Sequence, residues 1–289
     1  METESKENPN RLHRELQQPL APSALAISVK RLRILTGNCR NDNRSFLYKS
    51  KKRSERDMGL EKKILLFDLD GTLTDPKTGI TGCVQYALHK LGIEEPDKDK
   101  LEPFIGPPLA DSFQEFYGFD AEKSAEAIVY YRERFKSDGL FENEIYPGVR
   151  ELLAHLKQAG KTLAIASSKP TVFVTKILQH FDIEQYFDVI VGSELDGTRA
   201  RKEEVVEEAL RQLHQISGCV QEGKLLSDKK DNDRIVMIGD RKFDILGAKL
   251  FNLVSVGVMY GYALPGELEE AGADFIVESV AELEELLND

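Results

Sequence analysis

The stretch ILLFDLDGTLTD, residues 64–75, decides the fold and raises the first chemical question. Four apolar residues, Ile64 to Phe67, lead directly into Asp68 and Asp70. Residues two apart in an extended chain point to the same face, so these two carboxylates would repel each other and resist removal from water. The apolar run predicts a buried strand, and the acidic pair that follows it indicates a place for chemistry.

Short apolar runs alternate with amphipathic segments through most of the chain. We expect strands at residues 62–68, 162–168, 187–193, 234–240, 253–261 and 273–279, the last at an edge. Nearly continuous runs of Val, Ile and Leu are typical of parallel strands that helices cover on both faces. The pattern therefore predicts an α/β fold with a doubly wound, Rossmann-like parallel sheet.

The segment between the first two predicted strands has a different pattern. From Gly79 to about Tyr146 the spacing of apolar residues is helical, with no strand pattern. A simple crossover between parallel strands needs only about a dozen residues. We therefore expect an inserted all-helical cap at residues 78–146, and a catalytic core made of residues 58–77 and 147–289.

Residues 1–57 differ from the rest of the chain in charge. They contain 13 Lys and Arg against 7 Asp and Glu, whereas the whole chain has a net charge of -11. Because this basic segment has no sustained periodicity, we expect a disordered extension. A dispensable tail, an organelle-targeting segment and an artefact of the gene model remain alternatives, since Met58 opens a stretch that looks like a natural start.

The composition also excludes several classes of partner. A net charge of -11 argues against binding to nucleic-acid polymers, which requires a cationic surface. No apolar run of 18 residues occurs, so no membrane span is expected. The three cysteines are far apart and lack metal-ligand spacing. We expect a reduced, cytoplasmic protein that is a monomer or homodimer.

Polar side chains follow four of the predicted strands. In chain order they are Asp68 and Asp70, Ser167 and Ser168, Lys202, and Asp240 and Asp244. The carboxyl ends of parallel strands meet at one edge of the sheet, so we expect these groups to come together. Four crowded carboxylates require a cation, and hard oxygen ligands suit Mg²⁺. A divalent cation between the first two aspartates and a phosphate would explain why they tolerate each other.

These residues lie in four motifs, DLDGTLTD, ASSK, RARKEE and IGDRKFD, which resemble in order the motifs of the haloacid dehalogenase superfamily. Four ordered motifs are far more specific than one. The resemblance covers roughly Lys62 to Leu287, and the helical insertion resembles the small helical cap of the superfamily. Within it the chain is similar to phosphoglycolate-phosphatase-like members, and through GPPLADSF, SSKPTVF and GDRKFDILGA to a branch of bacterial 5′-nucleotidases.

The resemblance implies a Mg²⁺-dependent phosphomonoester hydrolase that forms an aspartyl-phosphate. In this scheme Asp68 is the nucleophile and Asp70 the general acid and base. Ser167 bonds a phosphoryl oxygen, and Lys202 offsets the negative charge. The implied metal ligands are Asp68, Asp70 through its backbone carbonyl, Asp240 and Asp244. The expected phosphate or substrate contacts are the amides of Gly71, Thr72 and Ser168, with Arg132 and Arg134 as cap candidates.

Taken singly, some of these residues have simpler interpretations. Ser167 and Ser168 would cap a helix, and Lys202 would be a surface lysine, with Arg199 and Arg201 leaving its register ambiguous. Arg132 and Arg134 would pack or face solvent on a cap helix. For the two serines and Lys202 the four motifs together favour the catalytic interpretation, whereas for the cap arginines packing or exposure is favoured, with substrate contact as the alternative.

The substrate is less constrained than the chemistry. We expect nucleoside 5′-monophosphates, with phosphoglycolate as the alternative, then a phosphosugar mutase reaction, and, from a different class, a non-catalytic binding module. Dehalogenases of the superfamily lack the second aspartate of the first motif, so Asp70 argues against dehalogenation. A mutase would depend on a bisphosphate activator.

Overall fold

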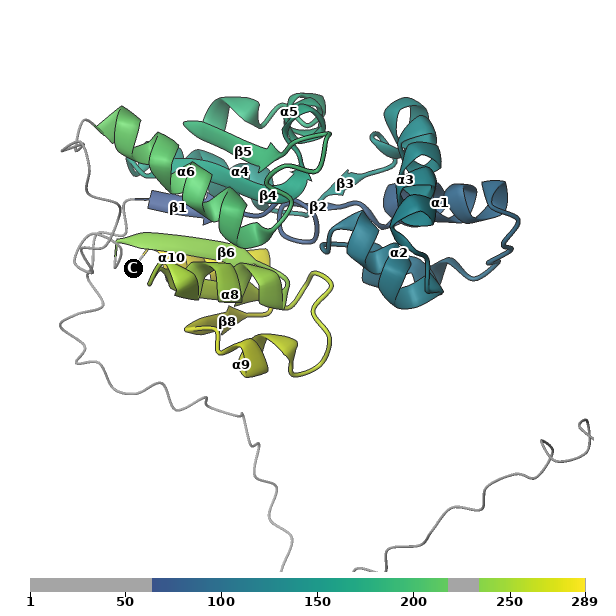
Figure 1. Ribbon diagram of the computed structural model, residues 1–289. Helices are drawn as coiled ribbons and strands as arrows, with labels where there is room; N and C mark the ends of the chain where they lie inside the picture. Colours follow the sequence, from purple (N-terminus) through teal and green to yellow (C-terminus); the bar gives the residue numbers. More distant parts are fainter. Residues whose placement is uncertain (1–63, 218–233, 289) are drawn as a thin grey trace, which may run out of the picture. The chain divides into compact units, whose positions relative to one another are not determined.

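The computed structural model describes residues 64–217 and 234–288. The described residues all belong to one compact unit (Figure 1). Residues 1–57, where we expect a disordered extension, and residues 218–233 lie outside the described part.

The core is a six-stranded parallel sheet, as the alternating pattern predicted. Its order is β5 (Val189–Ser193), β4 (Thr162–Pro170), β1 (Ile64–Phe67), β6 (Ile235–Gly239), β7 (Val254–Val258) and β8 (Phe275–Val277). Strand β1 is central, with Phe67 in register with Ile165 on one side and Ile238 on the other. Strand β8 is at an edge, which confirms the prediction for that segment.

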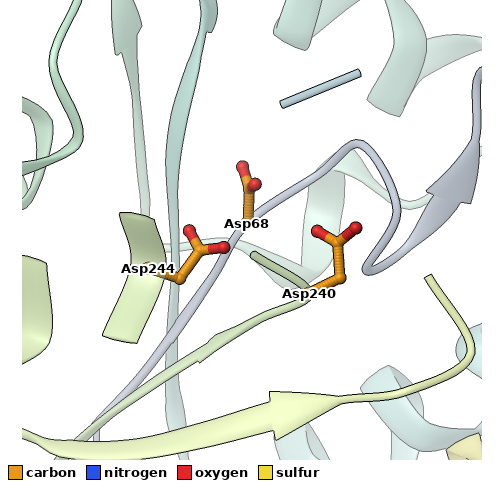
Figure 2. Close-up of side chains that lie close together, drawn as sticks. All are labelled: Asp68, Asp240 and Asp244. Carbon is orange, nitrogen blue, oxygen red and sulfur yellow. The ribbon is translucent and has the colours of Figure 1, made fainter. Parts of the chain in front are cut away.

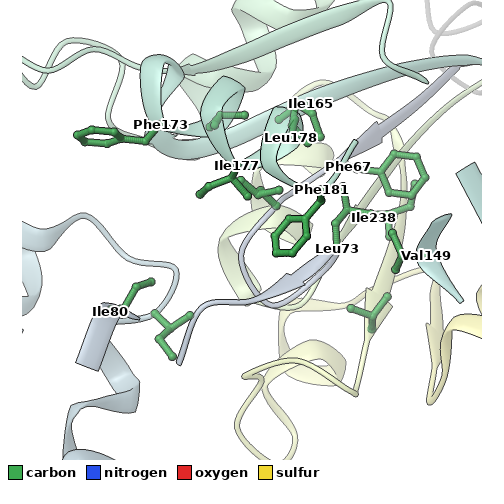
Figure 3. Packing of buried hydrophobic residues seen from close by; sticks show 14 of the residues in the cluster. Phe67, Leu73, Ile80, Val149, Ile165, Phe173, Ile177, Leu178, Phe181 and Ile238 are labelled. Atoms are coloured by element: carbon green, nitrogen blue, oxygen red, sulfur yellow. The ribbon is translucent and has the colours of Figure 1, made fainter. Parts of the chain in front are cut away.

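Helices cover both faces of the sheet, because the buried side chains of β1 alternate between two hydrophobic clusters. Leu65 and Phe67 belong to a cluster with residues of α4 (Val149–Gln158), α5 (Thr171–His180) and α10 (Val280–Asn288). Figure 3 shows part of this cluster, in which Phe67 and Ile238 lie near residues of α5. Leu66 belongs to the second cluster, with residues of α6 (Lys202–Ser217) and α8 (Lys242–Leu250). This alternation confirms the doubly wound fold.

The insertion between β1 and β4 contains α1 (Lys77–Lys90), α2 (Leu109–Tyr117) and α3 (Ala121–Arg134) (Figure 1). A 3₁₀ helix at Lys98–Phe104 precedes α2, and a π-helical turn at Phe135–Gly139 follows α3. The insertion differs from the predicted all-helical cap in one element. Strand β3 (Glu144–Ile145) pairs antiparallel with β2 (Thr74–Asp75), where the chain leaves and re-enters the core. Two residues give too short a pattern to be predicted as a strand.

The remaining helices are α9 (Glu267–Ala271), which packs next to α8, and a 3₁₀ turn at Glu184–Tyr186. Within residues 64–217 and 234–288, no helix is both long enough and apolar enough to cross a membrane.

Candidate active site

The ends of three neighbouring strands bring the predicted polar residues together. Asp68 follows β1, Asp240 follows β6, and Ser167 lies near the end of β4. Because β1 pairs with β4 on one side and β6 on the other, the residues after these strands share one edge of the sheet. All three side chains are buried.

Three carboxylates form an acidic cluster at this edge. Asp68, Asp240 and Asp244 each offer an oxygen, and these oxygens lie within 4.8 Å of one another. Figure 2 shows the three side chains projecting to the same side, Asp68 and Asp240 from strand ends and Asp244 from α8. A dense set of oxygen ligands of this kind fits a divalent cation such as Mg²⁺.

Burial and mutual repulsion destabilise the charged forms of these carboxylates. Burial raises the pKa of Asp240 well above its ordinary value, and the charges of Asp244 and Asp68 raise it further. Burial and the charge of Asp68 raise the pKa of Asp244 to about 6, against the opposing effect of Lys202. Buried carboxylates that repel each other favour binding of a cation, because the cation removes both the cost of burying their charge and the cost of their mutual repulsion.

Lys202 projects into the cluster from the first turn of α6. Its Nζ lies 3.0 Å from Asp68 Oδ1 and 2.8 Å from Asp244 Oδ1, and donates to the carbonyl of Ala166 at 2.9 Å. Burial lowers the pKa of Lys202, but the charges of Asp244 and Asp68 outweigh it and raise the pKa overall. Arg199 instead pairs with Glu194, so the structure resolves the ambiguous register in favour of Lys202. One ammonium leaves the charge of three carboxylates only partly offset.

Asp70 pairs with a lysine that has no predicted role in the sequence. Lys169 Nζ lies 2.5 Å from Asp70 Oδ2, and both side chains are buried. The same ammonium lies 4.9 Å from the ring centre of Phe135, a cap residue. Burial raises the pKa of Asp70 and the charge of Asp68 adds to this, while Lys169 opposes it. A raised pKa suits a carboxyl group that must donate a proton.

The irregular end of β4 explains why Lys169 was missed. The pairing of β4 with β5 shifts register between Ala166 and Pro170. Such a bulge redirects side chains, and simple strand alternation does not predict their direction. The signal in the sequence is the lysine directly after the two serines in ASSK, at a strand end that was already expected to meet Asp70.

The two serines of β4 are not helix caps. Helix α5 begins after Pro170 and has no side-chain cap, which removes the simpler interpretation of Ser167 and Ser168. Ser167 is buried, and its Oγ accepts a long bond of 3.4 Å from the amide of Lys169. That bond leaves its hydroxyl hydrogen available to a phosphoryl oxygen.

The turn after Asp70 packs directly against Asp240. Gly71 has φ +81°, and a Cβ there would lie 2.1 Å from Asp240 Oδ2. Thr72 Oγ1 donates to Asp240 Oδ1 at 3.4 Å. The amides of Gly71 and Thr72 donate to the carbonyls of Thr74 and Leu69, at 2.7 Å and 3.3 Å. These amides are bonded within the turn in this structure, and their contact with phosphate stays a prediction.

A cavity of about 160 Å³ lies between the cap and the sheet edge, with Asp70, Ser168 and Lys169 among its lining residues. Most of its wall is apolar. The large apolar side chains are Ile80, Phe104, Leu109, Ile128, Phe135 and Phe173. Asp70, the predicted acid and base, thus lines a mostly apolar cavity that a leaving group can enter.

Only one of the two cap arginines lines this cavity. Arg132 lines it, and its Nη1 donates to the carbonyl of Leu195 in the core at 2.7 Å. Arg134 forms two bonds to Glu142, at 2.7 Å and 2.8 Å, and a third to Cys83 Sγ at 3.3 Å. The structure thus brings Arg132 to the site and places Arg134 in the packing of the cap.

Comparison with known proteins identifies similar chains. Residues 65–258 match the family model of the haloacid dehalogenase-like hydrolases. A 5′-nucleotidase of Pseudomonas aeruginosa is 47% identical over 74% of this chain and 90% of its own. The tyrosine-protein kinase PtkA of Mycobacterium tuberculosis is 35% identical over 79% of this chain and 72% of its own. A phosphoglycolate phosphatase of Colwellia psychrerythraea is 29% identical over 77% of this chain and 96% of its own.

Solved structures of similar chains have the same fold. The crystal structure of a predicted phosphatase from Clostridium acetobutylicum has a TM-score of 0.69 and 47% sequence identity, and the match covers 77% of this chain and 96% of that one.

Proposed function

The chain belongs to the haloacid dehalogenase-like hydrolase family, and we propose that it is a Mg²⁺-dependent phosphatase that acts through an aspartyl-phosphate intermediate. The observation that carries the proposal is the arrangement at the strand ends. A buried carboxylate, Asp68, lies within 4.8 Å of two further carboxylates, and Asp70 is held beside it by Lys169. This set supplies a nucleophile, a metal site and an acid in one place.

The metal site would use residues that are already close together. Asp68, Asp240 and Asp244 would hold Mg²⁺ with their carboxylates, together with the backbone carbonyl of Asp70. When bound, the ion supplies the positive charge that lets a phosphate approach this acidic edge.

Asp68 and Asp70 would carry out the two steps of hydrolysis. Asp68 attacks phosphorus, the bond from phosphorus to the leaving oxygen breaks, and Asp70 gives that oxygen its proton. Asp70 next takes a proton from a water molecule as the water oxygen attacks phosphorus. The bond to Asp68 breaks, which releases phosphate and restores both carboxyl groups.

Two cations and a hydroxyl support these steps. Lys202 holds one oxygen of Asp68 at 3.0 Å and stays protonated, so the other oxygen is the one that attacks. Lys169 fixes the orientation of Asp70 toward the cavity. Ser167 would donate to a phosphoryl oxygen, and preorganised donors of this kind stabilise the charge of the transition state.

Nucleoside 5′-monophosphates are the substrate class that we propose first. The cavity next to Asp70 has three phenylalanine side chains in its wall, which suit the stacking of a nucleobase. The 47% identical relative is named a 5′-nucleotidase, which supports the same choice.

Phosphoglycolate is the second candidate. Arg132 lines the cavity and could bind the carboxylate of such a substrate through its remaining donors. Relatives named phosphoglycolate phosphatase, at 29% identity and below, support it less strongly. A mutase or a non-catalytic binding module has no comparable support, and both Asp68 and Asp70 are present.

The test is phosphate release by the full chain from AMP, other nucleoside monophosphates, phosphoglycolate and hexose phosphates, with Mg²⁺ and with a chelator. We expect Mg²⁺-dependent release that Asp68→Asn abolishes, and a higher kcat/KM for a nucleoside monophosphate than for phosphoglycolate. The preferred compound distinguishes the two candidates. Absence of release from every compound by a folded protein would refute the phosphatase proposal.

A further inference from the structure

Arg241, the residue after Asp240, reaches from the core into the cap. Its Nη1 donates to the carbonyl of Ile105 at 2.6 Å, and its Nε donates to Glu267 Oε1 at 2.9 Å. The side chain is only 9% exposed. Residues 136 positions apart are therefore joined by a buried, charge-assisted hydrogen bond, which is stronger than a bond between neutral groups.

The loop that receives this bond forms one wall of the substrate cavity. Residues 106–110, directly after Ile105, all line the cavity. Gly106 has φ +103°, and a Cβ there would lie 3.1 Å from Arg241 Cγ. The loop thus passes so close to Arg241 that its position depends on this side chain.

Glu267 holds Arg241 in one conformation. Its Oε1 also accepts from the amide of Lys242 at 2.8 Å, and its Oε2 accepts from the amide of Leu264 at 3.1 Å. Burial would raise the pKa of Glu267, but these donors and Arg241 lower it overall, so the carboxylate stays charged. A side chain that is already ordered loses little entropy when it holds the loop.

A second bond between cap and core differs in its surroundings. Arg132 donates to the carbonyl of Leu195, but this contact is exposed to solvent. Loss of a hydrogen-bond donor costs more at a buried carbonyl than at an exposed one, because water cannot take the place of the lost donor at the buried site. The backbone amide of Arg241 also donates to Asp244 Oδ2 at 3.1 Å, so this residue contacts both the acidic cluster and the cap.

We propose that Arg241 is a positioning residue that holds residues 105–110, a loop and the first two residues of α2, against the cavity and thereby sets the preference for substrates with a large apolar leaving group. The proposal rests on the phosphatase function proposed above. A large leaving group must contact the loop wall, whereas a small one reaches Asp70 without it. Loss of the bond should therefore affect large leaving groups more than small ones.

The test compares p-nitrophenyl phosphate with acetyl phosphate as substrates of the full chain with Mg²⁺. We expect Arg241→Met to lower kcat/KM for p-nitrophenyl phosphate about tenfold relative to kcat/KM for acetyl phosphate, in comparison with the unaltered protein. Loss of one buried charged hydrogen bond predicts a change of this size. Arg241→Lys, which keeps a charge and can make one of the two bonds, should give an intermediate ratio. A merely less stable protein would lose activity toward both substrates equally.

Lys242→Met is the matched control, because it removes the same charge from the adjacent, exposed side chain and leaves the bond to Ile105 intact. Its ratio should stay within about twofold of the unaltered value. Hydrogen exchange provides the second measurement. The amides of Ile105, Gly106 and residues 109–112 should exchange faster in Arg241→Met and Glu267→Gln than in Lys242→Met, with β1 and β6 unchanged.

An unchanged substrate ratio or unchanged exchange in Arg241→Met would overturn the proposal. If the unaltered protein releases phosphate neither from these two substrates nor from any compound of the panel above, the phosphatase function itself fails. Exchange at residues 105–112 then still decides whether Arg241 holds the loop, so the two failures are distinguishable.

Discussion

At the scale of single residues, the site depends on unequal pairing of four carboxylates with two lysines. Lys202 forms ion pairs with Asp68 and Asp244, and Lys169 forms an ion pair with Asp70. Asp240 is fully buried and accepts only from the hydroxyl of Thr72 and the amide of Tyr262 among the bonds described. The pairing separates the side chain of Asp70, the proposed acid, from that of Asp68, although the two residues are only two positions apart in the chain.

Replacement of Lys169 should show this division of roles. In Lys169→Met, Asp70 loses the cation that opposes its raised pKa, so that pKa rises further. Because Asp70 must be deprotonated to accept a proton from water, the acidic limb of the pH profile of kcat should move to higher pH. We expect kcat at neutral pH to fall about a hundredfold.

The control for this variant is Lys157→Met. Lys157 pairs with Asp188 away from the strand-end cluster, so its loss should leave the pH profile in place. An unshifted profile in Lys169→Met would show that the ion pair does not control Asp70.

Gly71 offers a second test at this scale. Gly71→Ala combines a left-handed backbone with a Cβ 2.1 Å from Asp240 Oδ2, so it should displace Asp240 and abolish activity. Gly92→Ala is the matched control, since Gly92 has a similar φ of +75° and no atom within 4 Å of the added Cβ. Both variants should lose about 1 kcal/mol or more of unfolding free energy from backbone strain. Equal activity of the two variants would contradict the role of the close contact.

At the scale of elements, helices of the cap pack closely on one another near β2 and β3. Helix α1 packs tightly on the turn after α3, because a Cβ at Gly79 would lie 2.2 Å from the carbonyl of Gly139. A Cβ at Gly139 would in turn lie 2.4 Å from Cys83 Sγ. Two glycines thus let the cap elements approach at the point where the chain returns to the core.

This packing predicts an unreactive thiol on α1. Burial raises the pKa of Cys83 to about 11, so only about one molecule in a thousand carries the thiolate at pH 8. In a Cys39→Ser, Cys219→Ser variant, the remaining thiol should resist a thiol reagent in the native state and react fully in denaturant. Rapid native labelling would mean that α1 separates readily from the turn at Phe135–Gly139.

At the scale of the whole molecule, the acidic cluster should link stability to metal. Burial of Asp68, Asp240 and Asp244 opposes folding, and a cation bound only by the folded state offsets that penalty. At a Mg²⁺ concentration 100 times Kd, binding should stabilise the folded state by about 2.7 kcal/mol. We expect this stabilisation to raise Tm by about 5–10 °C. Asp240→Asn should abolish most of the rise, and the same rise in that variant would place the ion elsewhere.

The order of strands and helices along the chain was predictable from the sequence, and so was the meeting of acidic, serine and lysine side chains at one edge of the sheet. Period-two and period-3.6 patterns are local, so β1, β4 and β6 were predictable from their apolar runs. The placement of Asp68, Ser167 and Asp240 at one edge followed from the general geometry of parallel sheets.

Only the tertiary structure decided which charges pair and what closes the cavity. Lys169 and Asp70 are 99 residues apart, and their contact depends on the register shift at the end of β4. Arg241 and Ile105 meet because the cap folds back over the core. Such contacts depend on the packing of distant elements, and burial then determines their strength, so no local pattern encodes them.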